Sequence, residues 1–344
     1  MKEKIRDPKF PATKQLAEGL TAALRDNGFS QRKMTILNRR PNPYNSTFPT
    51  EIIKCRLNSI GKTLGLFVKY ETGKFDSAYG HRGNVSYEAK VYREILNPLA
   101  LSTPKFYGIY NSESDGATWL ITEYMGRGVP ASWSKDPKAM TRSARWIGKF
   151  HAANEKRIQN SNLNFLRRYD EDYYIGWSQR TKRLFRRVHA KFPWLIPLCN
   201  EFEKRVSRLL SEPQTVVHGE YFGSNIVYQQ GVSRPIDWQS TAVAAGEVDL
   251  ASLTHSWASN VVQNCEREYT ESRWPMGAPA SFQETLEVAR VYMSLRWLGD
   301  PRLMSPLVTR QGRPVVSKNV FLAMQTMLEL RLVGKRLGLT REPA

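Results

Sequence analysis

Two neighbouring stretches decide how this chain folds: VVHGEYFGSNIVY at residues 216–228 and RPIDWQ at residues 234–239. They predict a tight loop, a short apolar strand, a turn and a second short strand that ends in a carboxylate. In this arrangement the side chains of Glu220, Asn225 and Asp237 can converge. One carboxylate can accept a hydroxyl proton, while the carboxamide and the second carboxylate offer oxygen ligands to Mg²⁺. The stretches therefore predict a phosphoryl-transfer site, with a hydrogen-bonded turn or the remnant of a lost site as the alternatives.

Upstream of these stretches the sequence is strand-like. Apolar runs bounded by Pro, Asn, Gly and Ser predict strands at residues 34–37, 51–57, 64–70 and 118–123. One helix is expected among them, because apolar residues recur at helical spacing over residues 87–96.

After residue 128 the apolar period becomes helical, which predicts helices at residues 136–150, 194–210, 281–297 and 317–337. A shorter helical pattern precedes the strands. These patterns predict an α+β fold in two lobes, the first small and β-rich, the second larger and mainly helical.

The composition limits the class of protein. The 344 residues include 41% hydrophobic residues, which is enough for a large core. No apolar run approaches the length of a membrane span and no signal peptide is recognisable, so a cytoplasmic protein without membrane contact is expected. Cys55, Cys199 and Cys265 are odd in number and far apart, which favours buried free thiols over disulfides or a metal site.

The net charge of +19 favours an anionic partner. We do not expect nucleic acid to be the main one, because the arginines are scattered and no helix-turn-helix, zinc-finger or RNA-recognition motif is present. No sequence feature indicates the oligomeric state.

The loop at residues 216–239 resembles the His-Gly-Asp-x4-Asn loop and the following Ile-Asp-Trp of the aminoglycoside phosphotransferase/choline kinase-like family, which has a protein-kinase-like fold. The resemblance extends over about residues 33–300. It implies ATP and Mg²⁺ as cofactors and a small-molecule hydroxyl as the acceptor. Together with the sequence patterns, it divides the chain into a helical extension at residues 1–32, a nucleotide-binding N-lobe at residues 33–125, and a C-lobe with the catalytic loop and the acceptor site at residues 126–344.

Within the catalytic loop, the resemblance makes Glu220 the catalytic residue, in a place where most of the family has aspartate. Glutamate has the same charge and one more methylene, so it can act as the base only if the loop or the substrate lies slightly further back. Asn225 and Asp237 are expected to bind Mg²⁺. For His218 a structural role in the loop is expected. Asp249 is expected to cap a helix or to brace the loop, with metal binding as the other possibility.

The resemblance also implies a nucleotide site in the first lobe. Lys69, on an otherwise apolar strand, is expected to bind phosphates and to pair with Glu88, for which Glu94 is the alternative. The other nucleotide contacts that it implies are Ser46 and Thr47 in a loop without glycine and Glu123 and Met125 in the hinge between the lobes.

The acceptor is expected to be neutral or anionic, because a polycationic aminoglycoside suits this basic chain poorly. Residues 180–191 carry six Lys or Arg and no acid, which predicts a basic helical ridge that faces either solvent or the acceptor. The aromatic residues of segment 169–177 line an acceptor pocket or belong to the core. The alternative function is a pseudokinase-like module that binds nucleotide without transferring phosphate.

Overall fold

The fold is given by a computed structural model, which describes residues 10–28, 34–44, 47–57, 61–71, 76–112, 116–301 and 318–338, without the side chains of 187–189 and 318–324. The chain divides into two compact units. The first consists of residues 1–129 and 234–240, and the second of residues 130–233 and 241–344. Asp237 therefore groups with the first unit, although it follows the loop of the second unit in the sequence.

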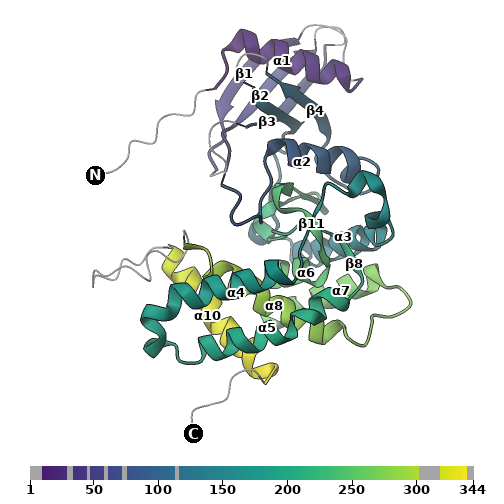
Figure 1. Cartoon of the computed structure of the whole chain (residues 1–344). Coiled ribbons are helices and arrows are strands. Elements are labelled where there is room, and N and C mark those ends of the chain that lie inside the picture. Colours follow the sequence, from purple (N-terminus) through teal and green to yellow (C-terminus); the bar gives the residue numbers. More distant parts are fainter. Residues whose placement is uncertain are drawn as a thin grey trace. The chain divides into compact units, whose positions relative to one another are not determined.

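The first unit is built on one antiparallel sheet, in which the strand order is β1-β2-β3-β5-β4 (Figure 1). The strands are β1 (Met34–Pro41), β2 (Thr50–Leu57), β3 (Thr63–Tyr70), β4 (Phe106–Asn111) and β5 (Thr118–Glu123). All but β4 are the strands that the apolar runs predict.

The apolar runs do not predict strand β4, because a glycine lies at its centre. Gly108 has a φ of 133° and lies at a register shift in the pairing with β5. A Cβ atom there would lie 2.3 Å from the side chain of Asn27 and 2.8 Å from the carbonyl oxygen of Ala23. The close approach of helix α1 (Thr13–Asp26) thus requires a residue that weakens the strand pattern.

Two helices complete the first unit. Three leucines on one face of α1 are buried in one hydrophobic core with strand residues such as Tyr70 and Trp119. The leucines are Leu16, Leu20 and Leu24. Helix α2 (Val85–Val91) starts at Asn84, whose side chain accepts a hydrogen bond from the backbone of Tyr87. A π-helical turn at Tyr92–Leu96 extends it, so the helix predicted over residues 87–96 is confirmed in two parts.

The second unit is mainly helical. Its helices are α3 (Ala139–Asn154), α4 (Glu171–Phe185), α5 (Leu195–Ser211), α6 (Glu247–Thr254), α7 (Ser259–Arg273), α8 (Phe282–Leu298) and α10 (Lys318–Arg336). Short strands form two small sheets of order β10-β9-β6 and β7-β11-β8. These strands are β6 (Val129–Pro130), β7 (Arg167–Arg168), β8 (Gln214–Val217), β9 (Ile226–Gln229), β10 (Val232–Pro235) and β11 (Ala242–Ala245).

The apolar periodicity gives neither α6, which was expected only through the possible helix cap at Asp249, nor α7, and the reasons are opposite. Every residue of α6 is buried, so the helix has no polar face that would give a helical period. Helix α7 is polar, and its buried residues are Cys265, Tyr269 and Arg273, spaced four apart. In the ranges that the structure describes, no helix is both long and apolar enough to cross a bilayer.

The predicted basic ridge is wrong as a single helix. Helix α4 ends at Phe185, and a 3-10 turn follows at Arg186–Lys191. Lys182 pairs with Glu203 of α5 at 2.8 Å, and the Arg180 guanidinium lies 4.2 Å from the centre of the Trp177 ring. Arg180 and Lys182 are therefore held by contacts within the second unit, whereas Arg183, Arg186 and Lys191 are exposed.

Candidate functional site

Lys69 is the centre of a buried charged cluster in the first unit. Its Nζ donates to Glu88 Oε2 at 2.7 Å and to Asp237 Oδ1 at 2.8 Å. The Lys69 and Glu88 side chains are 4% and 3% exposed, whereas that of Asp237 is 37% exposed. The cluster thus has an interior side, which fixes the lysine, and one carboxylate that reaches solvent.

Local folding explains how the members of the cluster meet. Lys69 lies in the middle of the sheet, opposite Thr50 of β2 and Leu120 of β5. Glu88 also accepts a hydrogen bond from the backbone of Trp238 at 3.1 Å, which ties α2 to the segment that follows β10. Glu94, the alternative partner for Lys69, instead accepts a hydrogen bond from Arg93. The expected pair of Lys69 with Glu88 is therefore present.

Asp237 has an uncommon backbone conformation, with a φ of 66°. Aspartate enters this left-handed region more readily than most residues, but the conformation still costs free energy. Two contacts hold the carboxylate, since Gln239 Nε2 donates to Oδ1 at 2.5 Å in addition to Lys69. Such a fixed, half-exposed carboxylate is suited to binding a ligand.

The electrostatics of the cluster keep Lys69 charged. Burial alone lowers the pKa of this amine, but the carboxylates of Asp237 and Glu88 outweigh that effect and raise its pKa above the ordinary value. The first unit therefore offers a fixed ammonium group beside a partly exposed carboxylate.

For the other residues predicted for the nucleotide site, the structure shows only local contacts or exposure. Ser46 lies outside the described residues, and Thr47 is exposed. Glu123 ends β5, and its carboxylate accepts a hydrogen bond from the backbone of Lys105 at 3.2 Å. Met125 lies two residues further on, and its carbonyl oxygen accepts from Gly128 at 2.9 Å.

The loop with Glu220 lies in the second unit, between β8 and β9. Gly219 has a φ of 83°, a left-handed conformation for which glycine is suited. His218 Nδ1 accepts from the backbone of Glu220 at 3.3 Å, and Asn225 Nδ2 donates to the carbonyl oxygen of Glu220 at 3.0 Å. Both side chains therefore shape the loop around Glu220, and His218 has the contact expected of a structural residue.

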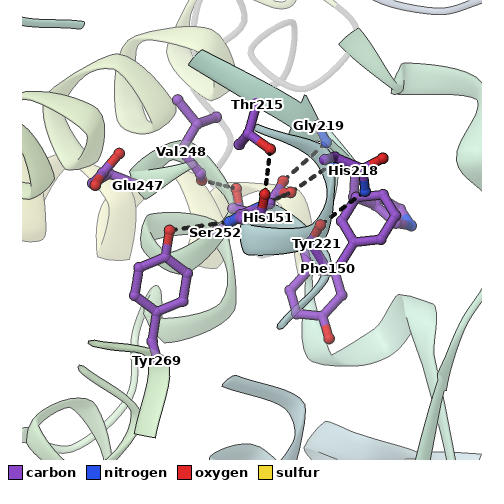
Figure 2. A network of polar contacts seen from close by, with 12 residues as sticks. Phe150, His151, Thr215, His218, Gly219, Tyr221, Glu247, Val248, Ser252 and Tyr269 are labelled. Carbon is purple, nitrogen blue, oxygen red and sulfur yellow. Dashed lines mark hydrogen bonds and ion pairs between the residues drawn. The ribbon is translucent and has the colours of Figure 1, made fainter. Parts of the chain in front are cut away.

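Asp249 braces this loop from α6. Figure 2 shows the polar network in which the loop residues His218 and Gly219 and the helix residues His151 and Tyr269 take part. Its Oδ2 accepts from the backbone of His218 at 2.6 Å and its Oδ1 from Gly219 at 2.9 Å. His151 Nε2 lies 3.2 Å from Asp249 Oδ2. The side chains of His151, His218 and Asp249 are fully buried. Since α6 already begins at Glu247, the contacts match the bracing role and not that of a helix cap.

His151 connects the brace to the helices behind it. Because a carboxylate only accepts, His151 Nε2 carries the hydrogen that Asp249 receives, and Nδ1 accepts from the Tyr269 hydroxyl at 3.0 Å. Arg273 in turn donates to Tyr269 at 2.6 Å. Burial lowers the pKa of His151, so the imidazole is neutral in the folded protein.

Glu220 forms an ion pair that the sequence did not indicate. Arg296 Nη1 on α8 donates to Glu220 Oε1 at 3.2 Å, and the two side chains are 10% and 9% exposed. The guanidinium also lies 5.9 Å from the centre of the Phe222 ring. This pair fixes the direction of a carboxylate that has one more rotatable bond than aspartate.

Three polar residues of the site were therefore missed: His151, Gln239 and Arg296. His151 and Gln239 stand inside segments that carry the family resemblance, so a signal was available. Arg296 follows Glu220 by 76 positions, and no local pattern links the two.

A divalent metal fits the donor types that the chain offers. A carboxylate and a carboxamide, Asp237 and Asn225, supply the oxygen ligands that Mg²⁺ prefers together with phosphate oxygens. The described residues contain no cluster of three or more His, Cys, Asp or Glu suited to holding a metal by themselves.

Comparisons with known proteins give the family and the fold of the chain. The model of the phosphotransferase enzyme family matches residues 76–280. Compared with curated protein sequences, the chain has no match.

Several solved structures share the fold. The choline kinase LicA from Streptococcus pneumoniae is 14% identical, with a TM-score of 0.59 over 93% of this chain and 98% of that chain. The aminoglycoside 2'-phosphotransferase-IIIa, solved with GDP, is 8% identical, with a TM-score of 0.61 over 94% and 98% of the two chains. The amicoumacin kinase hAmiN, in complex with AMP-PNP, Ca²⁺ and Ami, is 10% identical, with a TM-score of 0.56 over 86% and 87%.

Proposed function

The chain belongs to the phosphotransferase enzyme family, and from this premise we propose that it is an ATP- and Mg²⁺-dependent kinase for a hydroxyl group of a small neutral or anionic molecule. The observation that carries the proposal is the contact of one buried lysine with two carboxylates. Lys69 joins Glu88 in the interior to the partly exposed Asp237. A fixed cation beside an exposed carboxylate suits a phosphate chain with its metal ion.

In the first unit, Lys69 binds nucleotide phosphates and Glu88 orients its ammonium group. Asp237 of this unit and, in the second unit, Asn225 are the oxygen ligands proposed for Mg²⁺, which when bound would neutralise charge on the phosphate oxygens. The backbone of the segment Glu123 to Met125 contacts the base, and the loop with Ser46 and Thr47 covers the phosphates. The AMP-PNP, Ca²⁺ and GDP in the similar structures support a nucleotide with a divalent cation.

In the second unit, Glu220 accepts the hydrogen bond of the acceptor hydroxyl and orients it for attack. Little base strength is needed, because the transition state of phosphoryl transfer is loose and charge develops mainly on the phosphoryl oxygens. The Arg296 guanidinium fixes the carboxylate, and Asp249 holds the backbone that carries it. These contacts support catalysis by positioning.

A second candidate function is a module that binds nucleotide without transferring phosphate. One observation favours it: Glu220 is engaged in an ion pair with Arg296. The Glu220→Asp variant separates the two functions. A working kinase adapted to glutamate loses rate in this variant, whereas activity that occurs only with aspartate supports the binding module.

The proposal is tested by calorimetric titration of the full chain with ATP or GTP, each with and without Mg²⁺. Asp237→Asn should weaken the affinity for the Mg²⁺-nucleotide at least about tenfold, since it removes a charged ligand, and should abolish acceptor-dependent ADP release. Asp172→Asn, at an exposed position in the first turn of α4, is the matched control and should behave like the wild type. Equal Mg²⁺-nucleotide affinity and turnover in Asp237→Asn would refute the proposed role.

A further inference from the structure

Arg296 has hydrogen-bond donors that its contact with Glu220 does not use. Its side chain is nine-tenths buried, and a guanidinium carries five N–H donors. Within the part of the chain that the structure describes, its hydrogen bonding consists of the one contact with Glu220. None of the buried side-chain atoms that lack a partner among the described residues belongs to Arg296, so its remaining donors reach solvent and can bind a ligand or water.

The surroundings of Arg296 are aromatic and contain one described counter-ion. The Phe222 ring lies beside the guanidinium, and Tyr292 stands one helical turn earlier on α8. The Tyr292 and Tyr173 hydroxyls bond to each other at 2.8 Å. Burial lowers the pKa of Arg296. The Glu220 carboxylate and the neighbouring tyrosines outweigh this effect and raise the pKa above its ordinary value. The remaining donors of the arginine are thus not directed at a second acid of the described chain.

We propose that Arg296 binds an oxyanion of the acceptor, so that the substrate is a small hydroxy acid or hydroxylated phosphate. This inference rests on the proposed role of Glu220 in orienting the acceptor hydroxyl. Because Arg296 Nη1 lies 3.2 Å from Glu220 Oε1, one molecule can meet both side chains.

Hydrogen-bond lengths limit the size of this molecule. The hydroxyl lies about 2.7 Å from the carboxylate of Glu220, and the oxyanion about 2.8 Å from the guanidinium. If the hydroxyl binds Glu220 Oε1 and the oxyanion binds Arg296 Nη1, which lie 3.2 Å apart, the two ligand groups are at most about 9 Å apart. A hydroxyl and a carboxylate or phosphate group separated by a few carbon atoms fit this span.

The same arginine would select against cationic acceptors. An ammonium group beside a buried guanidinium is repelled, and Glu220 is already neutralised by Arg296. The net charge of +19 acts in the same direction over the whole chain.

The test uses matched pairs of potential acceptors. Hydroxy acids and sugar acids are each compared with their primary amide, and sugar phosphates with the free sugar, by ADP release from the full chain with ATP and Mg²⁺. Wild-type protein should phosphorylate an anionic member with a kcat/KM about tenfold to hundredfold above its neutral partner, as expected for a hydrogen bond to a charged group. The two sets of pairs distinguish a carboxylate from a phosphate.

Variants then assign the preference to Arg296. Arg296→Met also disturbs Glu220, but that effect is common to both members of a pair, so the ratio of their kcat/KM values isolates the anion contact. This ratio should fall to about one, whereas Arg296→Lys should retain part of it. Arg145→Met, which removes an exposed arginine of α3, should leave the ratio unchanged.

A measurement on the wild type covers the case in which Arg296→Met does not fold. The deoxy analogue of the preferred acid should compete with it, and the deoxy analogue of the amide should not. Phosphorylation of neutral members without an advantage for the anionic ones, or an unchanged ratio in folded Arg296→Met, would overturn the inference and leave the proposed kinase function standing. Failure to phosphorylate any member of either set, anionic or neutral, would refute both.

Discussion

Replacing Asp249 by asparagine should loosen the loop that carries Glu220. The aspartate accepts backbone hydrogen bonds from His218 at 2.6 Å and Gly219 at 2.9 Å, and it is fully buried. Asparagine has nearly the same shape but one acceptor oxygen, so its amide group faces a backbone N–H. A hydrogen bond to a charged group contributes about 1.5–3 kcal/mol. Losing one and weakening the other should lower the free energy of unfolding by about 3 kcal/mol.

Urea unfolding of the full chain, fitted for midpoint and slope, measures this change. The turnover number should fall together with the stability, because the backbone on both sides of Gly219 is no longer held. Asp172→Asn removes an exposed carboxylate of the same unit and should alter the free energy of unfolding by less than about 0.5 kcal/mol. A change below about 1 kcal/mol in Asp249→Asn, with unchanged turnover, would show that Asp249 does not brace the loop.

Three further predictions test other contacts. Lys69→Met leaves a buried carboxylate without its charged partner, so urea unfolding should show a loss of about 3–5 kcal/mol, and calorimetry a nucleotide affinity at least tenfold weaker. Burial lowers the pKa of His151 in the folded protein. The free energy of unfolding should therefore fall as the pH drops below about 6.5, because the unfolded chain then binds the proton more readily. His151→Gln should show a smaller fall between about pH 7 and 5 in the same assay. In Gly148→Ala the new Cβ would lie 2.1 Å from the Ser272 hydroxyl, which should cost about 1–3 kcal/mol of thermal or urea stability. Gly176→Ala, where the nearest atom at 3.3 Å is the end of a flexible side chain, should instead gain about 0.5–1 kcal/mol, and equal effects of the two alanines would contradict the packing.

The charged cluster in the first unit was largely predictable. Lys69 interrupts an apolar strand, so its amine needs a partner in the interior, and Glu88 stands at the spacing found in the related kinases. What the sequence could not show was that Asp237 shares the lysine or that Gln239 holds the same carboxylate. Both contacts depend on a left-handed backbone at Asp237, for which aspartate gives only a weak local signal.

The second unit was less predictable because its contacts join distant positions. Arg296 lies on a helix that is buried on most sides, where a single arginine gives no hint of its partner. The predicted basic ridge was wrong because charge does not fix where a helix ends, and α4 ends at Phe185. Strand β4 was not predicted because its contact with α1 requires Gly108, and glycine is a residue that strand patterns avoid.

The central claim is that Glu220 positions a hydroxyl group for phosphoryl transfer. Phosphorus nuclear magnetic resonance of the full chain with ATP, Mg²⁺ and the paired acceptors tests it most directly, because a phosphate monoester has its own signal. Wild-type protein should form the monoester, and Glu220→Gln, which keeps the shape without the charge, should form it at least about a hundredfold more slowly while nucleotide affinity is unchanged. Equal rates in the two proteins, or nucleotide binding by the wild type without a monoester from any acceptor, would contradict the account.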